Sequence, residues 1–432
     1  MFVTGRLVLL VAVGVVPVVV LAAGGLPAWA VAGGWMLLSA VLVAVDVVLA
    51  GDLRALEIAR RLPARTLRDE PALSEIVLTN PGGRRVRGVL RDGWQPTAGA
   101  APARIGLDVP AGERRIVRQA LRPRRRGELR TAFVAVRASG PLGLAGRQRT
   151  LDAPGRIRVL PPFRARRHLP SRLARLREID GNTSVLVRGE GSEFDSLREY
   201  VRGDDVRSID WRATARAGAT MLRTWRPERD RHVVIVVDTG RTAAARVGDG
   251  TRLDAAMEAA LLVAALAARA GDHVHLLMFD RTVRARVTRT DGPPLLPALV
   301  DAMAPVEAQL IDTDWDAAFA AARSFTTRPS LVVVLTAHDE PEASRGFLGS
   351  LPALAARTRV LVATASDAEQ LPAPHDATDV YVAAAAARAA ADTERVAAAV
   401  RRAGAEVVTA SADDLPPRVA DHYLALKAAG RL

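Results

Sequence analysis

The chain is 432 residues long, has no cysteine and carries a net charge of +13. This length predicts two or three domains, and the missing cysteine excludes disulfides, thiolate metal sites and a cysteine nucleophile. Positive charge is concentrated in residues 1–232, which hold 40 Lys and Arg against 22 Asp and Glu, whereas the remainder holds 20 against 25. Aromatic residues are only 4% and no nucleic-acid-binding motif is present, so we expect the basic half to face anionic lipid and not nucleic acid.

Two uncharged runs, 7–23 and 28–45, open the chain and are separated by Gly24–Pro27. Each is close to the length of about 20 apolar residues that crosses a bilayer, so residues 1–51 are predicted to form a transmembrane hairpin. A cleaved signal peptide followed by one anchor, or a buried hairpin, are the alternatives. Arginines precede the first run and follow the second, which predicts a cell-membrane protein with two helices and the bulk of the chain in the cytoplasm.

Residues 52–162 are predicted to form a small β-sandwich. Short alternating runs separated by Gly, Pro and Asn support this assignment, and they fall at 73–79, 86–90, 114–121 and 128–136. Residues 163–230 are predicted to form a basic linker followed by a densely charged block.

The charged block, Gly189–Gly218, interleaves acids and arginines with large apolar residues. Such carboxylates either form Arg–carboxylate ion pairs that hold one domain against another, or contribute to a partner-binding surface, or take part in acid–base chemistry. Within the block, Asp210 is predicted to cap a helix that begins at Trp211.

Residues 231–432 alternate buried apolar strands with helices, which predicts an α/β domain with a doubly wound parallel sheet. The predicted strands are 233–237, 273–279, 283–288, 331–335, 359–364 and 406–410. Ligands of such sheets bind at the carboxyl ends of the strands. Asp238 stands at one strand end, the loop 312–316 provides another hydroxyl and more carboxylates, and 336–339 follows a third strand, so the chemistry suits a hard cation such as Mg²⁺.

The charged block resembles the signature of the domain of unknown function 58 (DUF58) family. The matching residues are Arg198-Glu199-Tyr200, Gly203-Asp204-Asp205, Arg207, Ile209-Asp210-Trp211 and Ala213-Thr214-Ala215-Arg216. Upstream, Arg126-Gly127 and Pro141-Leu142-Gly143-Leu144 are similar to two further family elements, although Gly140 replaces an expected Asp.

The resemblance implies a von Willebrand factor A-like C-terminal domain. It also implies a MoxR-type AAA+ ATPase as partner, with a transglutaminase-like membrane protein as a second possible partner. The metal motif of such domains would fall on Asp238, Thr242, Thr313 and Asp339, but Gly240 lacks the usual hydroxyl and Asp339 is displaced. The resemblance and the charge pattern together predict that the partner-binding or interdomain residues are Arg198, Glu199, Tyr200, Asp204, Asp205, Arg207, Asp210, Trp211 and Arg216.

We therefore expect a membrane-anchored binding or scaffold protein that acts in assembly or activation of protein complexes. No Walker A loop, Gly-x-Ser-x-Gly elbow or His-Glu-x-x-His motif is present. The enzymatic alternative is a metal-dependent hydrolase that uses the strand-end carboxylates Asp238 and Asp312.

Overall fold

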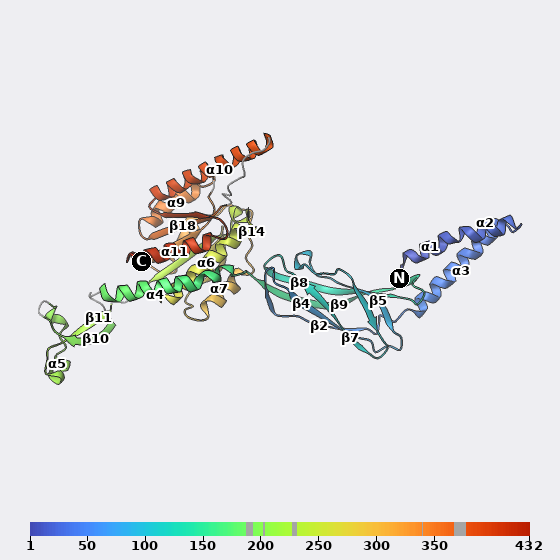
Figure 1. The fold of residues 1–432 in the computed structure, drawn as a ribbon, viewed down its shortest axis with the longest axis horizontal. Coiled ribbons are helices and arrows are strands. Elements are labelled where there is room, and N and C mark those ends of the chain that lie inside the picture. The colour runs from blue at the N-terminus through green and yellow to red at the C-terminus, as the bar shows by residue number, and fades with distance from the viewer. Residues whose placement is uncertain (187–192, 202–203, 227–230, 339, 367–376) are drawn as a thin grey trace. The chain divides into compact units, whose positions relative to one another are not determined.

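The computed structural model describes residues 1–432 except 187–192, 202–203, 227–230, 339 and 367–376. The chain divides into two compact units, 1–160 and 161–432, which we describe separately (Figure 1). The first unit holds two apolar helical segments and two β-sheets, and the second holds a six-stranded sheet with helices on both faces.

The first unit opens with a helical hairpin. Two segments, Gly5–Ala23 and Ala28–Leu49, are long and apolar enough to span a membrane. The first is interrupted at Gly14, which separates α1 (Gly5–Val13) from α2 (Val15–Ala23), because the ring of Pro17 clashes with a carbonyl four residues before it. The indole of Trp35, on α3 (Ala28–Leu49), fills this position and donates its Nε1–H to the carbonyl of Leu10 at 3.1 Å. This hydrogen bond joins α1 to α3.

The sheet region of this unit has one large and one small sheet. The large sheet has the order β1-β9-β8-β5-β6, with β3 also paired to β9, and the small sheet has the order β2-β4-β7. The strands are β1 (Phe2–Val3), β2 (Glu57–Arg61), β3 (Arg65–Leu67), β4 (Ala72–Thr79), β5 (Val86–Asp92), β6 (Ile105–Val109), β7 (Arg114–Leu121), β8 (Gly127–Ser139) and β9 (Ala145–Leu160), with a short 3₁₀ turn at Pro96–Ala98.

A shared core joins these two sheets. Ile76 and Leu78 of the small sheet pack with Val86, Leu90 and Val134 of the large one. A buried ion pair also crosses the core, since Arg60 donates to both oxygens of Asp92 at 2.6 and 2.7 Å. Two sheets packed face to face by alternating side chains form a sandwich.

The second unit is built on one six-stranded sheet of order β16-β15-β12-β17-β18-β19. All neighbours are parallel except β15 and β16. The strands are β12 (His232–Asp238), β15 (His273–Phe279), β16 (Val283–Val287), β17 (Leu331–Leu335), β18 (Arg359–Ala365) and β19 (Glu406–Ala410). Parallel strands buried on both faces explain the continuous Val and Leu runs.

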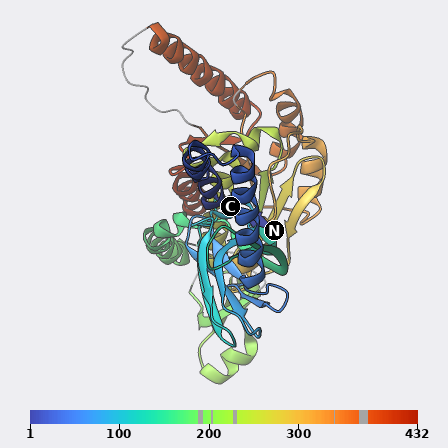
Figure 2. The ribbon, with the colours of Figure 1, turned by 90° about the vertical axis from the view of Figure 1, so that its right-hand side faces the viewer.

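Helices cover both faces of this sheet (Figure 1). One face packs against α4 (Leu169–Leu186), α6 (Arg252–Arg269), α7 (Leu295–Met303) and α11 (Leu415–Ala428), and the other against α8 (Trp315–Arg323), α9 (Arg345–Ala355) and the end of α10 (Ala377–Arg402). Val380 to Ala391 of α10 are almost all exposed, and this part of the helix extends away from the sheet in both views (Figures 1 and 2). Short elements complete the unit at Arg164–His168, Arg241–Ala244, β13 (Arg246–Val247) and β14 (Gly250–Thr251).

The segment that the sequence suggested as a basic linker belongs in large part to the second unit. Leu176 on α4 is buried in the core beneath α6 and α11, and Arg172 forms an ion pair with Asp421 at 2.6 Å. Apolar residues at helical spacing among the arginines of α4 account for this packing.

The only lysine of the chain is also part of this core. Lys427 on α11 lies 3.2 Å from Asp272, with side chains 3% and 2% exposed, and Tyr423 donates its hydroxyl to the same carboxylate at 2.5 Å. Paired in this way, the buried charges avoid the cost of an isolated one.

Candidate functional site

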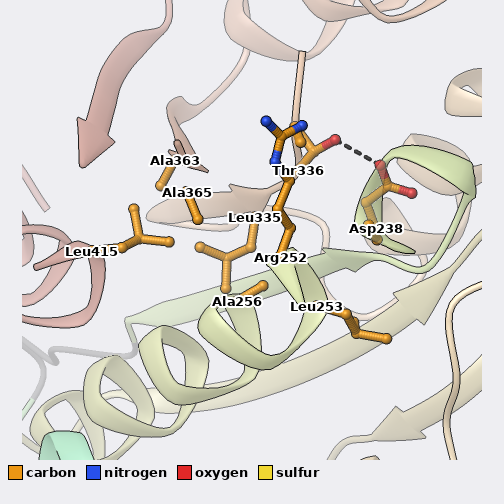
Figure 3. Close-up of a pocket in the computed structure, with 11 residues that line it drawn as sticks. Asp238, Arg252, Leu253, Ala256, Leu335, Thr336, Ala363, Ala365 and Leu415 are labelled. Atoms are coloured by element: carbon orange, nitrogen blue, oxygen red, sulfur yellow. Dashed lines mark hydrogen bonds between the residues drawn. The ribbon is translucent and has the colours of Figure 1, made fainter. Parts of the chain in front are cut away.

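Asp238 ends β12 at the point where the winding of the sheet reverses. From β12 the chain passes to β15 on one side, and β17 lies on the other. Crevices at such switch points, outside the carboxyl ends of the strands, are where open α/β sheets bind ligands. Asp238 and Thr336, which follows β17, border this position, and Figure 3 shows them facing each other.

The buried carboxylate of Asp238 is surrounded by hydroxyl groups. Thr313 donates to Oδ1 at 2.5 Å, while Thr336 and Thr242 donate to Oδ2 at 2.7 and 3.2 Å. The backbone N–H of Gly240 donates to Oδ1 at 2.8 Å. Four donors occupy the oxygens of a carboxylate that is 3% exposed, so this buried polar group is fully hydrogen-bonded.

Gly240 is required by this arrangement. A Cβ at this position would overlap the hydroxyl oxygen of Thr313 and lie 2.9 Å from the carbonyl oxygen of Ile311. The residue without a side chain therefore makes room for Thr313, which supplies a hydroxyl to Asp238 in place of one from position 240.

A second buried carboxylate, Asp280, follows the neighbouring strand β15 and was not singled out from the sequence. Burial alone would raise its pKa, but hydrogen bonds from Arg284 at 2.5 Å, from the N–H groups of Arg281 and Thr282, and from Thr239 outweigh this and hold the pKa below its usual range. Its position directly after a predicted strand was the available signal.

The carboxylates of the 312–316 loop do not join Asp238. Asp312 is exposed and pairs with Arg241 at 3.2 Å, and Asp314 caps α8 by accepting the N–H of Ala317 at 3.0 Å. After β17, the Thr336 hydroxyl lies 3.3 Å from His338 Nε2. Asp339 lies outside the described residues.

A small pocket opens beside Asp238 between α6 and the ends of β17 and β18 (Figure 3). Asp238, Thr336 and Arg252 provide its polar lining, and Leu253, Ala363 and Leu415 provide apolar contacts. Asp238, with Thr242 and Thr313, which bind its carboxylate outside the pocket lining, would hold a hard cation through oxygen atoms. In the part of the chain that the structure describes, no three His, Asp or Glu side chains come close enough to bind one. The set therefore offers one carboxylate and three hydroxyls, and the carboxylate oxygens already accept four hydrogen bonds.

The charged block forms a compact hairpin in the second unit. Strands β10 (Glu193–Glu199) and β11 (Met221–Arg226) pair antiparallel, and a 3₁₀ turn at Val206–Ser208 and helix α5 (Trp211–Ala217) lie between them. Leu222 and Ala213 are buried within it. Gly189–Ser192, Arg202 and Gly203 lie outside the described residues.

The three aspartates described between the two strands bind groups of the same hairpin. Asp204 pairs with Arg198 at 2.6 Å and accepts the N–H of Val201, while Asp205 accepts the N–H of Arg207. Asp210 caps α5, and the N–H of Ala213, together with Arg223 at 2.7 Å, holds its pKa below the usual range. These carboxylates stabilise the turns and helix of the hairpin.

Other side chains of the block face solvent. Trp211, at the first position of α5, is 71% exposed, and Val201 and Val206 are 62% and 61% exposed. Glu199, Arg207 and Arg216 are also exposed, and Tyr200 is half-buried. The hairpin therefore presents an indole and aliphatic groups next to guanidinium groups, a composition typical of protein-binding surfaces.

Comparison with known proteins gives one family match and several partial relatives. The model of the family described as "Protein of unknown function DUF58" matches residues 196–413. The uncharacterized proteins Rv1480 of Mycobacterium tuberculosis and Mb1516 of Mycobacterium bovis are each 29% identical to this chain over 114 residues, or 26% of it. The match spans 36% of the length of these curated relatives.

Among solved structures, the chain is similar to the ASH/PapD-like domain of human CEP192, with 17% identity and a TM-score of 0.19 over 24% of this chain and 84% of that one. It is also similar to the CARDB domain of PF1109 from Pyrococcus furiosus, with 13% identity and a TM-score of 0.18 over 26% of this chain and 91% of that one.

Proposed function

Because this chain belongs to the DUF58 family of proteins of unknown function, we propose its role from its own surface: it is a membrane-anchored binding protein whose charged block docks a partner protein. The observation that carries the proposal is the exposure of Trp211 beside aspartates, Asp204 and Asp210, that are paired with arginines of the same hairpin. An exposed tryptophan beside arginines is the residue combination most enriched where binding energy concentrates.

The partner we propose is the MoxR-type AAA+ ATPase implied by the resemblance, with a transglutaminase-like membrane protein as a further component. Three exposed arginines of the block, Arg207, Arg212 and Arg216, suit an acidic surface on that partner. The hairpin of apolar helices would hold the protein in the cell membrane, and the arginines flanking it favour a cytoplasmic location for the rest.

The second unit is proposed to be von Willebrand factor A-like, on the grounds of its strand order and of Asp238, Thr242 and Thr313 at the strand ends. Mg²⁺ stays a proposed but weak ligand, because Asp238 supplies a single carboxylate and its oxygens already accept four hydrogen bonds.

The test is a pull-down from native membranes with the full-length protein. Trp211→Ala should abolish recovery of an AAA+ ATPase that the wild type retains. Tyr381→Ala is the matched control, since this aromatic residue is 78% exposed on α10. Asp238→Ala, examined in parallel, separates the two candidate sites. Recovery by Trp211→Ala at the wild-type level would refute docking through the block. Loss in Asp238→Ala alone, with that variant shown to be folded, would move the interface to the strand ends.

A further inference from the structure

The base of the apolar hairpin is fixed to the sandwich by a buried aspartate. Asp46, in the last turn of α3, accepts the backbone N–H groups of Leu142, Leu144 and Ala145 at 2.8, 2.7 and 2.8 Å. A Cβ at Gly140 would overlap its carboxylate, so the loop before β9 wraps closely around it. Both oxygens of Asp46 are therefore occupied by the backbone of this loop.

Three arginines lie around this base. Arg84 and Arg147 donate to the carbonyls of Val48 and Val47 at 2.5 and 3.1 Å, and these carbonyls belong to the last turn of α3. Arg6, in the first turn of α1, lies against Gly143 in the loop that binds Asp46. The hydrogen bonds to α3 place two guanidinium groups where the apolar helix ends, which is the depth of lipid head groups when the helix spans a bilayer.

Two carboxylates lie near these arginines in the described part of the chain: Asp46, which is held by the backbone of the loop, and Asp52. Arg147 has Asp52 at 4.0 Å, with this carboxylate about half exposed, whereas Arg6 and Arg84 form no ion pair in the described part of the chain. Each guanidinium has five N–H donors. Arg84 and Arg147 each use one of theirs in the hydrogen bond to α3. The remaining donors of Arg6 and Arg84 have no carboxylate partner within ion-pair distance in the described part of the chain.

Apolar side chains accompany the arginines. Leu142, in the loop that holds Asp46, is 45% exposed, and Val48 on α3 is 57% exposed. A phospholipid with a net negative charge matches this combination, because its phosphate binds guanidinium groups through paired hydrogen bonds and its acyl chains contact apolar side chains.

We propose that Arg6, Arg84 and Arg147 form a binding site for the phosphate of an anionic phospholipid at the base of the hairpin. The site rests on membrane insertion of the hairpin, which is part of the proposed function, and it does not depend on the charged block or its partner. Zwitterionic phospholipid carries a compensating cation, so the site distinguishes the two lipid classes by charge.

The experiment uses the full-length protein in nanodiscs made of equal parts phosphatidylcholine and phosphatidylglycerol. Lipids that stay bound after transfer to detergent are counted by native mass spectrometry. Wild type should retain phosphatidylglycerol in preference to phosphatidylcholine, and Arg84→Gln/Arg147→Gln should lower this preference on the order of tenfold. Arg118→Gln/Arg130→Gln is the matched control, because it removes the same charge from arginines of the sandwich that pair with Glu75 and Glu128.

A further variant separates lipid binding from folding. Arg84→Gln/Arg147→Gln also removes two hydrogen bonds to α3, whereas Arg6→Gln leaves both in place and should still lower the preference severalfold. Equal retention of the two lipids by the wild type, or an equal loss in the control, would overturn the site. Extraction of the protein from membranes by alkaline carbonate would overturn membrane anchoring as well, whereas stable insertion without lipid preference overturns this inference alone.

Discussion

The strand-end site and the charged block both attract attention in the sequence as clusters of carboxylates, yet the structure uses their acids differently. Asp238 is buried and is satisfied by hydroxyls from three separate loops. Asp204, Asp205 and Asp210 lie at the surface and are satisfied by residues near them in the hairpin. A dense cluster of acids therefore does not by itself identify a site. What matters is which groups remain exposed, and that is Trp211 in the block.

The largest expected effect is on the free energy of unfolding, where the buried Asp238 should differ from the exposed Asp312. Asp238→Ala leaves three hydroxyls and one N–H without their acceptor, so we expect a loss of about 3 kcal/mol in the free energy of unfolding. Asp312→Ala, at an exposed ion pair, should cost under about 0.5 kcal/mol. Denaturant unfolding of the full-length protein in detergent measures both. Similar losses would refute the assignment of Asp238 as the centre of a buried network.

A second change examines why position 240 is glycine. Gly240→Ser restores the hydroxyl that the metal motif would have, but its Cβ would overlap Thr313, so we expect a loss of about 2 kcal/mol. Adding Thr313→Ala should recover part of it, and the recovery is a coupling energy measurable by a double-mutant cycle. Additive losses would contradict the close contact between the two residues.

A pH titration examines a histidine near the amino-terminal end of β15, away from the strand ends that carry Asp238. Burial, followed by repulsion from His232 and His273, lowers the pKa of His275 to about 4, against about 6.5 in the unfolded chain. Between these values the unfolded chain binds a proton that the folded one does not, so the free energy of unfolding falls as pH falls from about 6.5 to about 4. His275→Asn should flatten this slope in unfolding measurements across that range. An unchanged slope would assign it to other groups.

A smaller effect concerns the internal role of the acids in the block. Asp210→Ala removes the cap of α5 and the partner of Arg223, and we expect a fall of about a degree or two in the unfolding midpoint. Asp204→Ala, at an ion pair whose side chains are 32% and 22% exposed, should change it less. A larger effect of Asp204→Ala would mean that this residue, and not the helix cap, organises the hairpin.

The smallest effect on stability should come with the largest effect on binding. Trp211→Ala removes an exposed side chain, so we expect a change within about 0.5 kcal/mol in the free energy of unfolding. Loss of stability well beyond this would show that the indole packs against the protein and would remove the main support for the docking surface.

Alternating and continuous apolar patterns in the sequence predicted many of the strands of both units. The strands β4, β5, β7 and β8 alternate in the expected way, but β9 was not predicted, because Pro154, Gly155 and several arginines obscure its alternation. The parallel strands of the second unit were predicted from their apolar runs. Which strands pair could not be predicted from these runs, because β12 pairs with β17, which lies nearly a hundred residues further along the chain.

The site was less accessible from sequence. Asp238, Thr313 and the segment 336–339 were singled out as separate candidates. The hydrogen bonds from Thr313 and Thr336 to Asp238 were not predicted, because they join residues 75 and 98 positions apart. Gly240 looked like a defect in a metal motif until its distance from Thr313 was known. The pairs Arg198–Asp204 and Asp210–Arg223 show that two aspartates of the block bind arginines of the hairpin formed by β10 and β11, an alternative that the sequence left open.

The burial of Lys427 determines how a partner of this protein should be trapped chemically. The chain has one lysine, and its amine is enclosed beside Asp272 and Tyr423 with a side chain 3% exposed. Amine-reactive cross-linkers will therefore not reach the lysine side chain of the folded protein. A negative result with these reagents says nothing about binding. Carboxylate-directed or photoactivated reagents, placed near Trp211, are therefore the suitable choice for cross-linking a bound partner.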